Sequence, residues 1–292
     1  MHSLLDISSL SKENIATIFD YASSYQKMKR DSILQGKDIV IAFFESSTRT
    51  RCSFDLAVKR LGGNSISFNA QGSSISKGES FIDTIHTLNQ YDVQGWIIRH
   101  GHAYAPHILQ QETQSMVINA GDGSHQHPTQ ALLDAYTLYS KWGSLEGKNI
   151  MIVGDVLHSR VARSNIQLLS MLGAKIFVSG PGTLLPRFLP NITIVPTIHD
   201  AIHEMDGVIM LRIQLERMKN GLIPSKSEYA RYFSINEAMI VKHDKLLVLH
   251  PGPANYGLEL SMECMNHKNV LIREQVKYGL YIRMAVLKHC FT

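Results

Sequence analysis

Short apolar runs alternate with segments of helical spacing along most of the chain. Residues 39–44 form an apolar run typical of a strand that is buried on both faces of a parallel sheet. The segment behind it carries apolar residues at i, i+3, i+4 and i+7, the spacing of one helix face: Phe54, Ala57, Val58 and Leu61. This pairing of strand with helix recurs, and it predicts an α/β protein built on parallel sheets flanked by helices.

The same patterns predict the remaining elements. Further strands are predicted at residues 64–69, 94–100, 116–119, 149–153, 175–179, 192–196, 207–211 and 246–249. Helices are predicted at residues 9–30, 79–91, 127–139, 161–172, 198–204 and 274–290. The helix that opens at residue 127 is expected to bury Tyr139, and the last helix is expected to bury Val276. Residues 212–229 are expected to form a polar loop, because Lys-Asn-Gly at 219–221 is a turn signal.

The strand and helix alternation stops and then restarts, which predicts two domains. Residues 142–147, Trp-Gly-Ser-Leu-Glu-Gly, separate the two series. A chain of 292 residues is long enough for two hydrophobic cores. We predict one domain at 1–143, with a C-terminal helix at 274–292 packing back on it, and a second domain at 144–273.

The composition is that of an ordinary globular protein, with 44% hydrophobic and 18% charged residues. A formal net charge of +4, without a basic tract, does not favour nucleic acid as a partner. The three cysteines, Cys52, Cys264 and Cys290, are too scattered for a disulfide framework, which favours a reducing cytoplasm. We expect neither a signal peptide nor a membrane span, because no basic N-terminal region and no long apolar run is found.

The polar segment after the strand at 39–44 has the composition of an anion site. Residues 47–51 read Ser-Thr-Arg-Thr-Arg and stand where the next helix begins. First-turn N–H groups have no intrahelical partners, and the helix dipole favours negative charge there. The planar fork of arginine also matches a phosphate or a carboxylate. The alternative is a Ser/Thr helix cap beside two solvated arginines, which this segment by itself does not exclude.

Polar residues also follow other predicted strands, at the edge where parallel sheets bind their ligands. They are Arg99, His127, residues 155–160, Arg212 and residues 251–253. Several arginines placed in this way favour a small polyanionic ligand. No G-x-G-x-x-G or P-loop motif follows a strand, so we expect no nucleotide cofactor. The pairs at 100/102 and 125/127 are histidines without a matching Cys, Asp or Glu set, so we expect no metal.

Together and in this order, the motifs resemble those of the aspartate/ornithine carbamoyltransferase family, over nearly the whole chain. The most specific are Ser-Thr-Arg-Thr-Arg at 47–51 and His-Pro-Thr-Gln at 127–130. Lys-Gly-Glu at 77–79 and Arg-Ile-Gln at 212–214 favour the aspartate branch of the family. The ornithine branch would carry His-Cys-Leu-Pro where this chain has His-Pro-Gly-Pro at 250–253.

The resemblance implies an enzyme that transfers the carbamoyl group of carbamoyl phosphate to the amine of L-aspartate, without a cofactor. The residues implied to hold the phosphate are Ser47, Thr48, Arg49 and Thr50. Those implied to contact the carbamoyl group are Thr50, Arg99, His127, Gln130 and Pro251, with Gly252 as a further substrate-binding residue. The residues implied to bind the carboxylates of L-aspartate are Arg160, Arg212 and Gln214.

The resemblance also implies a homotrimer with shared active sites, an early step of pyrimidine biosynthesis and a cytoplasmic location. Ser73 and the catalytic Lys77 would come from a neighbouring subunit, and Arg283 would have an ancillary role. A regulatory chain or a dihydroorotase remains open as a partner. Two other functions also stay open: a non-enzymatic anion binder and a transcarbamylase for another amino acid. Where bacterial relatives often carry an arginine after the Pro-x-Pro turn, this chain has Tyr256.

Overall fold

The computed structural model describes residues 2–69, 78–188, 191–214, 223 and 225–292. The chain folds into two compact units. Unit 1 comprises Met1–Leu133 together with Val276–Thr292, and unit 2 comprises Asp134–Gln275. None of the helices in the described ranges combines the length and the apolar character that crossing a membrane requires.

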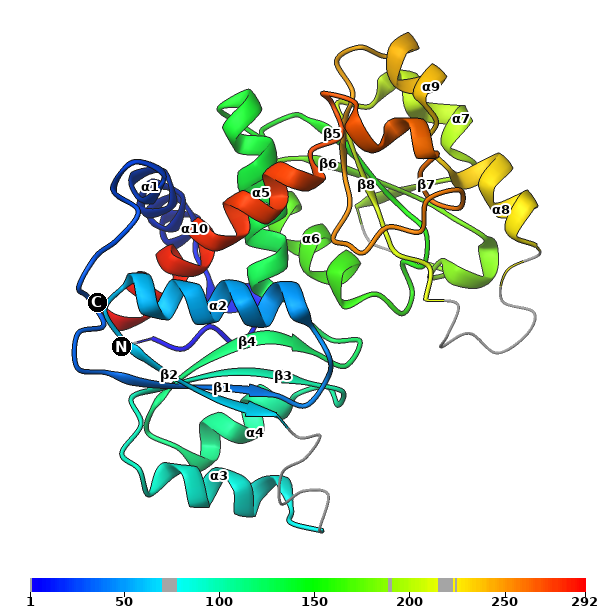
Figure 1. Ribbon diagram of the computed structural model, residues 1–292. Coiled ribbons are helices and arrows are strands. Elements are labelled where there is room, and N and C mark those ends of the chain that lie inside the picture. The colour runs from blue at the N-terminus through cyan, green and yellow to red at the C-terminus, as the bar shows by residue number, and fades with distance from the viewer. Residues whose placement is uncertain (1, 70–77, 189–190, 215–222, 224) are drawn as a thin grey trace. The chain divides into compact units, whose positions relative to one another are not determined.

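A parallel sheet forms the centre of unit 1, with its strands in the order β2–β1–β3–β4 (Figure 1). The strands are β1 (Asp38–Phe43), β2 (Asn64–Asn69), β3 (Gly95–His100) and β4 (Met116–Asp122). The chain passes from β1 to β2 on one side and then returns to β3 on the other. The order of the strands therefore reverses between β1 and β3, which is where open α/β sheets bind ligands.

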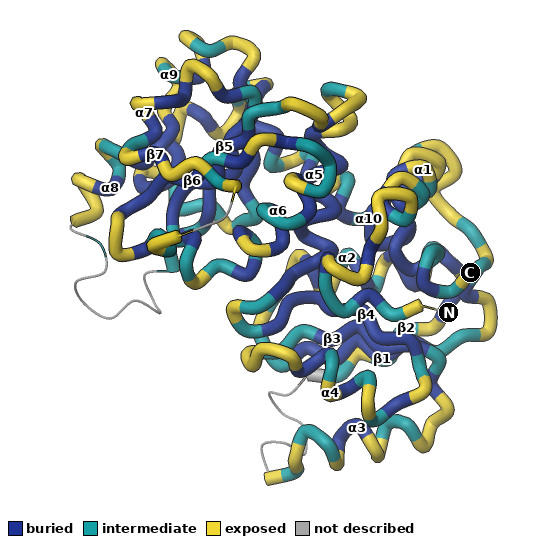
Figure 2. Tube along the Cα trace, turned by 180° about the vertical axis from the view of Figure 1, so that it is seen from behind, coloured by how far each residue is buried: buried dark blue, intermediate teal, exposed yellow. Residues whose placement is uncertain are grey.

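Helices cover both faces of this sheet, which explains why β1 is apolar at every position after Asp38. The helices are α1 (Lys12–Met28), α2 (Thr48–Arg60), α3 (Phe81–Asn89), α4 (Ala105–Glu112) and parts of α5 (Pro128–Trp142) and α10 (Ile272–Phe291). On one face, Ile85 of α3 and Leu109 of α4 pack with Val40, Trp96 and Val117 of the strands. Helix α2 lies on the opposite face (Figure 1). Figure 2 shows the strands buried between these layers and the outer side of α3 exposed.

The C-terminal helix packs against the N-terminal part of the chain, as predicted. The Arg283 guanidinium lies 5.2 Å from the centre of the Phe54 ring in α2, and Lys288 Nζ lies 3.3 Å from Asp31 Oδ2. The prediction that Val276 is buried is wrong, since that residue is 55% exposed. Burial in α10 is nearly continuous only from Tyr281 onward, so the first turns of this helix do not share the inward stripe.

Unit 2 is built on a second parallel sheet, with its strands in the order β7–β6–β5–β8–β9 (Figure 1). The strands are β5 (Asn149–Val153), β6 (Lys175–Ser179), β7 (Ile192–Val195), β8 (Gly207–Met210) and β9 (Leu247–Leu249). The helices of this unit include α6 (Arg160–Met171), α7 (Ile198–Ala201), α8 (Lys226–Phe233) and α9 (Glu237–Lys242). The order of the strands reverses between β5 and β8.

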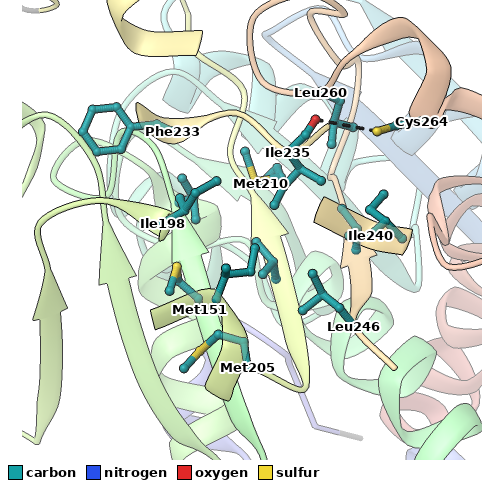
Figure 3. Close-up of a cluster of buried hydrophobic side chains, with 14 of the residues drawn as sticks. Met151, Ile198, Met205, Met210, Phe233, Ile235, Ile240, Leu246, Leu260 and Cys264 are labelled. Atoms are coloured by element: carbon teal, nitrogen blue, oxygen red, sulfur yellow. Dashed lines mark hydrogen bonds between the residues drawn. The ribbon is translucent and has the colours of Figure 1, made fainter. Parts of the chain in front are cut away.

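A single face of this sheet meets α7, α8 and α9 in a hydrophobic cluster (Figure 3). Met151 of β5 and Met210 of β8 lie among Ile198, Phe233 and Ile240 of the three helices. The Cys264 thiol closes one end of the cluster, where Sγ donates to the Ile235 carbonyl oxygen at 3.6 Å. These buried positions on alternate residues of the strands fix which face of the sheet turns inward.

The structure corrects the predicted elements in three places. The loop predicted at 212–229 ends earlier, because α8 starts at Lys226 and Ser225 Oγ accepts from the Glu228 N–H at 3.1 Å. Helices α4 and α9 were not predicted, and the visible signal for α4 was Pro106 in its first turn. Tyr139 was predicted to be buried and is 39% exposed.

Candidate functional site

The predicted anion segment of unit 1 lies at the start of α2, directly beyond β1. Ser47 is the N-cap residue, with an extended backbone, and its side chain does not form the usual capping bond. Thr48 and Arg49 are exposed in the first turn, whereas Thr50 is buried. The first turn of a thirteen-residue helix is therefore presented at this edge of the sheet with hydroxyl and guanidinium groups around it.

Arg99 lies beside this segment, because β3 is the neighbour of β1 and Arg99 pairs with Phe43 in the ladder. Its Nη1 donates to the Ala120 carbonyl oxygen at 3.3 Å, and its Nε lies 3.6 Å from Oε2 of Glu45. Both side chains are mostly buried, at 15% and 16% exposure. Glu45, to which the sequence interpretation gave no role, thus helps to orient a predicted catalytic arginine.

His127 and Gln130 lie on the segment that leaves β4. His127 directly precedes α5, Gln130 lies in its first turn, and both side chains are buried. The Gln130 N–H donates to the His127 carbonyl oxygen at 3.0 Å, which closes this turn. The structure places both residues beyond the carboxyl end of β4, two strands from the anion segment of α2.

A buried carboxylate shapes the turn that leads to His127. Asp122 ends β4 and is 0% exposed. Its Oδ1 accepts from Asn119 Nδ2 at 2.8 Å and from the Gln126 N–H at 3.0 Å. Its Oδ2 accepts from the Tyr104 N–H at 2.7 Å and lies 3.0 Å from His125 Nδ1. These contacts fix the backbone before His127, and the sequence interpretation did not single out Asp122.

His100 lies at the end of β3 in an aromatic setting, and its pKa is shifted. Its ring centre is 4.8 Å from that of Phe44 and 5.1 Å from that of Phe81. Burial lowers the pKa of His100 below its ordinary value, and the charge of His102 acts in the same direction. Among the described residues, no group of three or more His, Cys, Asp or Glu side chains is arranged to hold a metal ion.

In unit 2, the turn after β5 leads to Arg160. Gly154 has a φ of +123°, and a Cβ there would lie 3.2 Å from the Tyr229 hydroxyl, so the position suits glycine. Ser159 caps α6 by accepting from the Ala162 N–H at 3.1 Å, and Arg160 is the first residue of that helix. Burial raises the pKa of Tyr229, and the nearby carboxylates of Glu259 and Asp155 raise it further.

The other predicted residues of unit 2 follow the two strands next to β5. Arg212 and Gln214 come after β8, and Pro251 and Gly252 come after β9. All four residues are half-buried. Because β5, β8 and β9 are consecutive and parallel, the segments that follow them lie at one edge of the sheet. Ser73 and Lys77, the remaining predicted site residues, lie outside the described residues.

Each unit therefore carries arginines at the carboxyl edge of its own sheet, next to the place where the strand order reverses. Arg49 and Arg99 flank that place in unit 1, and Arg160 and Arg212 flank it in unit 2. Guanidinium groups at such edges bind phosphates and carboxylates through paired N–H donors. The arrangement is suited to binding an anion in each unit.

Two family models match the chain along most of its length. Residues 2–140 match the carbamoyl-P binding domain of aspartate/ornithine carbamoyltransferase, and residues 146–290 match the Asp/Orn binding domain. The second match includes most of α10, and the fold places this helix in unit 1 from Val276 onward. The C-terminal helix is thus assigned to one domain by sequence order and to the other unit by packing.

Relatives of known name and structure agree with these matches. The aspartate carbamoyltransferase catalytic subunit of Solibacter usitatus is 45% identical over 98% of this chain and 97% of its own length. A crystal structure of aspartate transcarbamoylase from Trypanosoma cruzi, in complex with carbamoyl aspartate and phosphate, has a TM-score of 0.91 at 30% identity, covering 99% of this chain and 95% of that chain. The catalytic subunit of the M. jannaschii enzyme has a TM-score of 0.87 at 33% identity, covering 99% of this chain and 97% of that chain.

The 45% identity extends over both domains, and the fold and the order of the motifs agree with it. The chain therefore belongs to the aspartate/ornithine carbamoyltransferase family.

Proposed function

We propose that this protein is an aspartate carbamoyltransferase, which transfers the carbamoyl group of carbamoyl phosphate to the amine of L-aspartate. The products are N-carbamoyl-L-aspartate and phosphate. The observation that carries the proposal is the presence of an arginine-bearing sheet edge in each unit of a chain from this family. One substrate carries a phosphate and the other carries two carboxylates, so each needs its own set of cationic donors.

Unit 1 is proposed to bind carbamoyl phosphate, within a carbamoyl phosphate-binding domain at 1–143 that is completed by the helix at 274–292. The phosphate is held by the first turn of α2 and by the residues around it: Ser47, Thr48, Arg49 and Thr50. The carbonyl oxygen receives hydrogen bonds from Thr50, Arg99 and His127, and Gln130 binds the carbamoyl amino group. The support is that these residues lie at the carboxyl ends of β1, β3 and β4 of a single sheet, with Arg99 near the end of β3 and the others beyond β1 or β4.

Unit 2 is proposed to bind L-aspartate, within an aspartate-binding domain at 144–273. Arg160, Arg212 and Gln214 bind the two carboxylates, and Pro251 and Gly252 approach the carbamoyl group. A site built to satisfy two carboxylates rejects an acceptor that lacks one, because its buried donors are then left without partners. This is the physical basis for preferring aspartate over ornithine.

The proposed reaction needs positioned donors and no cofactor. The amine attacks the carbamoyl carbon, negative charge grows on the carbonyl oxygen, and the C–O bond to phosphate then breaks. Donors preset at that oxygen stabilise this charge, and one such donor contributes about 3 kcal/mol. The departing phosphate accepts the proton that the amine loses, so no separate general base is required. Holding the two anions in attack geometry supplies the remaining acceleration.

We further propose a homotrimer in which Ser73 and Lys77 reach the site of a neighbouring subunit, in the cytoplasm and in pyrimidine biosynthesis. A closed ring allows each subunit both to give and to receive such a segment. The support is the family membership together with the polar, glycine-flanked sequence at 71–78. A regulatory chain or a dihydroorotase is compatible with this assembly.

The proposal is tested by measuring carbamoyl transfer with a panel of amine acceptors. Purified protein is incubated with carbamoyl phosphate and one acceptor, and the ureido product is measured colorimetrically. We expect turnover with L-aspartate and rates lower by a factor of about 10³ or more with L-ornithine, because a missing carboxylate leaves charged donors unpaired. Comparable turnover of L-ornithine contradicts the acceptor assignment. Absence of turnover with every acceptor contradicts the enzymatic function and favours an anion binder.

A further inference from the structure

Unit 2 contains a fully buried carboxylate that belongs to none of the predicted substrate contacts. Glu259 is 0% exposed, and both of its oxygens accept hydrogen bonds. Oε1 accepts from the Ile213 N–H and from Asn255 Nδ2, each at 2.7 Å. Oε2 accepts from the Asn255 N–H at 2.6 Å and lies 2.9 Å from His250 Nε2. A buried carboxylate is costly unless such donors surround it.

One of these contacts, together with a second hydrogen bond from Asn255, fixes the backbone of Ile213, which lies between Arg212 and Gln214. Glu259 accepts from the N–H of Ile213, while Asn255 Nδ2 donates to the carbonyl oxygen of the same residue at 3.1 Å. The Ile213 side chain is itself 0% exposed. With its N–H, its carbonyl and its side chain all held, Ile213 leaves the residues on either side little freedom in backbone direction.

The contact between Glu259 and His250 holds the segment after β9 in the same way. The Gly252 N–H donates to His250 Nδ1 at 2.9 Å, so Nδ1 must carry the lone pair of the ring. The ring proton is therefore on Nε2, which donates to Glu259. Gly252 is held through His250, and the backbone of Asn255 is held by the carboxylate directly.

The same polar chain continues to the helix that begins with Arg160. The His250 N–H donates to Gln275 Oε1 at 2.9 Å, and Gln275 Nε2 donates to Asp134 Oδ1 at 2.7 Å. Asp134 Oδ2 accepts at 2.9 Å from Asn165 Nδ2, and Asn165 lies in α6. All of these side chains are buried. The segments after β5, β8 and β9 are thus joined by one network of hydrogen bonds inside unit 2.

We propose that Glu259 is a positioning residue for L-aspartate, which acts by holding the backbone of Ile213 and Asn255 so that Arg212 and Gln214 face the substrate together. This inference rests on the proposed function, because it assigns the acceptor to these segments. An apolar side chain would fill the same space at lower desolvation cost if packing alone were needed. A carboxylate that receives N–H groups from two binding segments instead preorganises both of them before the ligand arrives.

The test compares Glu259→Gln with a matched surface variant. Glutamine keeps the shape, but its NH₂ group faces donors where an oxygen accepted before, so two contacts are lost. We expect the KM for L-aspartate to rise about tenfold or more, because small displacements of binding groups are costly. The dissociation constant of carbamoyl phosphate, measured by calorimetry, should stay within about twofold, since the residues proposed to hold its phosphate and carbonyl oxygen all belong to unit 1 and are unchanged. The control is Glu204→Gln, which removes an exposed carboxylate beside His203 and should leave both constants unchanged.

A second readout does not depend on turnover. Hydrogen exchange should be faster in Glu259→Gln than in the parent at the amide of Ile213 or of Asn255, because the two amides bond to different oxygens of Glu259 and glutamine keeps only one of these acceptors. If the parent protein shows no carbamoyl transfer, the proposed function fails, while these exchange rates still report whether the carboxylate holds the two segments. If Glu259→Gln does not fold, Asn255→Ala replaces it in the test, because it removes one donor to the carboxylate and leaves the carboxylate in place. It should raise the KM for L-aspartate by a smaller factor.

Two results overturn the inference. One is a folded Glu259→Gln protein with the parent's KM for L-aspartate and the parent's exchange rates. The other is an equal rise of the aspartate KM and of the carbamoyl phosphate dissociation constant, accompanied by a loss of cooperative unfolding in both Glu259→Gln and Asn255→Ala. That pattern would mean that Glu259 supports the stability of the fold and does not position the acceptor site.

Discussion

An exposed arginine and two buried carboxylates have different roles at the two sheet edges. Arg49 is open to solvent at the start of α2, whereas Asp122 and Glu259 are fully buried and accept hydrogen bonds from the backbone of the neighbouring segments. The exposed charges can meet a ligand, and the buried ones hold the chain that carries the ligand-binding groups. This division predicts different consequences for substitutions of the two kinds.

Replacement of Arg49 by alanine should abolish carbamoyl transfer while the fold is kept. The guanidinium is exposed in the first turn of α2, so its loss removes a charge-assisted phosphate contact and little packing. We expect kcat/KM to fall by a factor of about 10² or more, with an unchanged melting temperature. The control is Arg51→Ala, which removes the same charge two residues further along α2. Activity of Arg49→Ala near that of the parent would refute the role of this segment.

The lowered pKa of His100 predicts a pH dependence of stability. Because the folded protein resists protonation of His100, the unfolded chain takes up the proton first when the pH falls below the ordinary value of 6.5. The free energy of unfolding should therefore decrease as the pH falls from 6.5 toward the lowered folded-state pKa. Glu45 and Asp122 oppose this effect, since both raise the pKa of His100.

This dependence is measured by urea unfolding of the parent and of His100→Asn across that range. Asparagine does not titrate, so the variant should lose less stability than the parent as the solution is acidified. Identical slopes in His100→Asn and the parent would contradict the assignment.

The turns between strand and helix place the functional side chains, and they do so with backbone conformations that few residues adopt. Gly123 lies in the turn between β4 and α5, with a φ of +47°, and its N–H donates to the His100 carbonyl oxygen at 2.9 Å. A Cβ at this position would lie 2.6 Å from the backbone nitrogen of Ala103. The turn that presents His127 is therefore compatible with glycine and with little else.

Gly123→Ala should destabilise unit 1 through this contact. We expect the free energy of unfolding to fall by about 2 kcal/mol or more, because both backbone strain and a steric clash are introduced. Gly36→Ala is the matched control in the same unit, with a φ of +70° and no atom within 4 Å of the added methyl group. It should cost only about 1 kcal/mol. Equal losses in the two variants, measured by urea unfolding, would show that the contact with Ala103 is relieved without cost.

For the complete molecule, the proposed trimer predicts that each active site is completed by a second chain. The proposal of shared sites rests on Lys77, which lies outside the described residues, and on family membership. It predicts that Lys77→Ala and His127→Ala are each nearly inactive, for different reasons. Because the two residues of one site would come from different chains, subunit exchange between these variants creates sites with neither defect.

The activity expected after subunit exchange can be calculated. Random exchange of equal amounts in a trimer makes about a quarter of all sites intact, so activity should rise to about a quarter of that of the parent. Native mass measurement should detect three copies of the 32.8 kDa chain and confirm that mixed trimers have formed. Mixed trimers without recovered activity would show that Lys77 acts within its own chain or has no part in the site.

The sequence by itself determined the fold class, the strands and the arginines at the sheet edges. Apolar runs such as residues 39–44 and their partner helices are local patterns, and burial on both faces of a parallel sheet leaves them little ambiguity. Arg49, Arg99, Arg160 and Arg212 follow predicted strands, and the structure places each one at the carboxyl edge of its sheet. Local order along the chain was sufficient, because parallel strands bring their carboxyl ends together.

Only the tertiary structure decided which polar residues hold that edge in place. Glu259 is 46 residues from Ile213, and Gln275 is 141 residues from Asp134, so no local pattern links them. A buried carboxylate is indistinguishable in sequence from a solvated one until its donors are known. The predictions that Tyr139 and Val276 are buried were wrong for the same reason. Helical spacing predicts an apolar stripe along a helix, and only tertiary packing decides which parts of that stripe are covered.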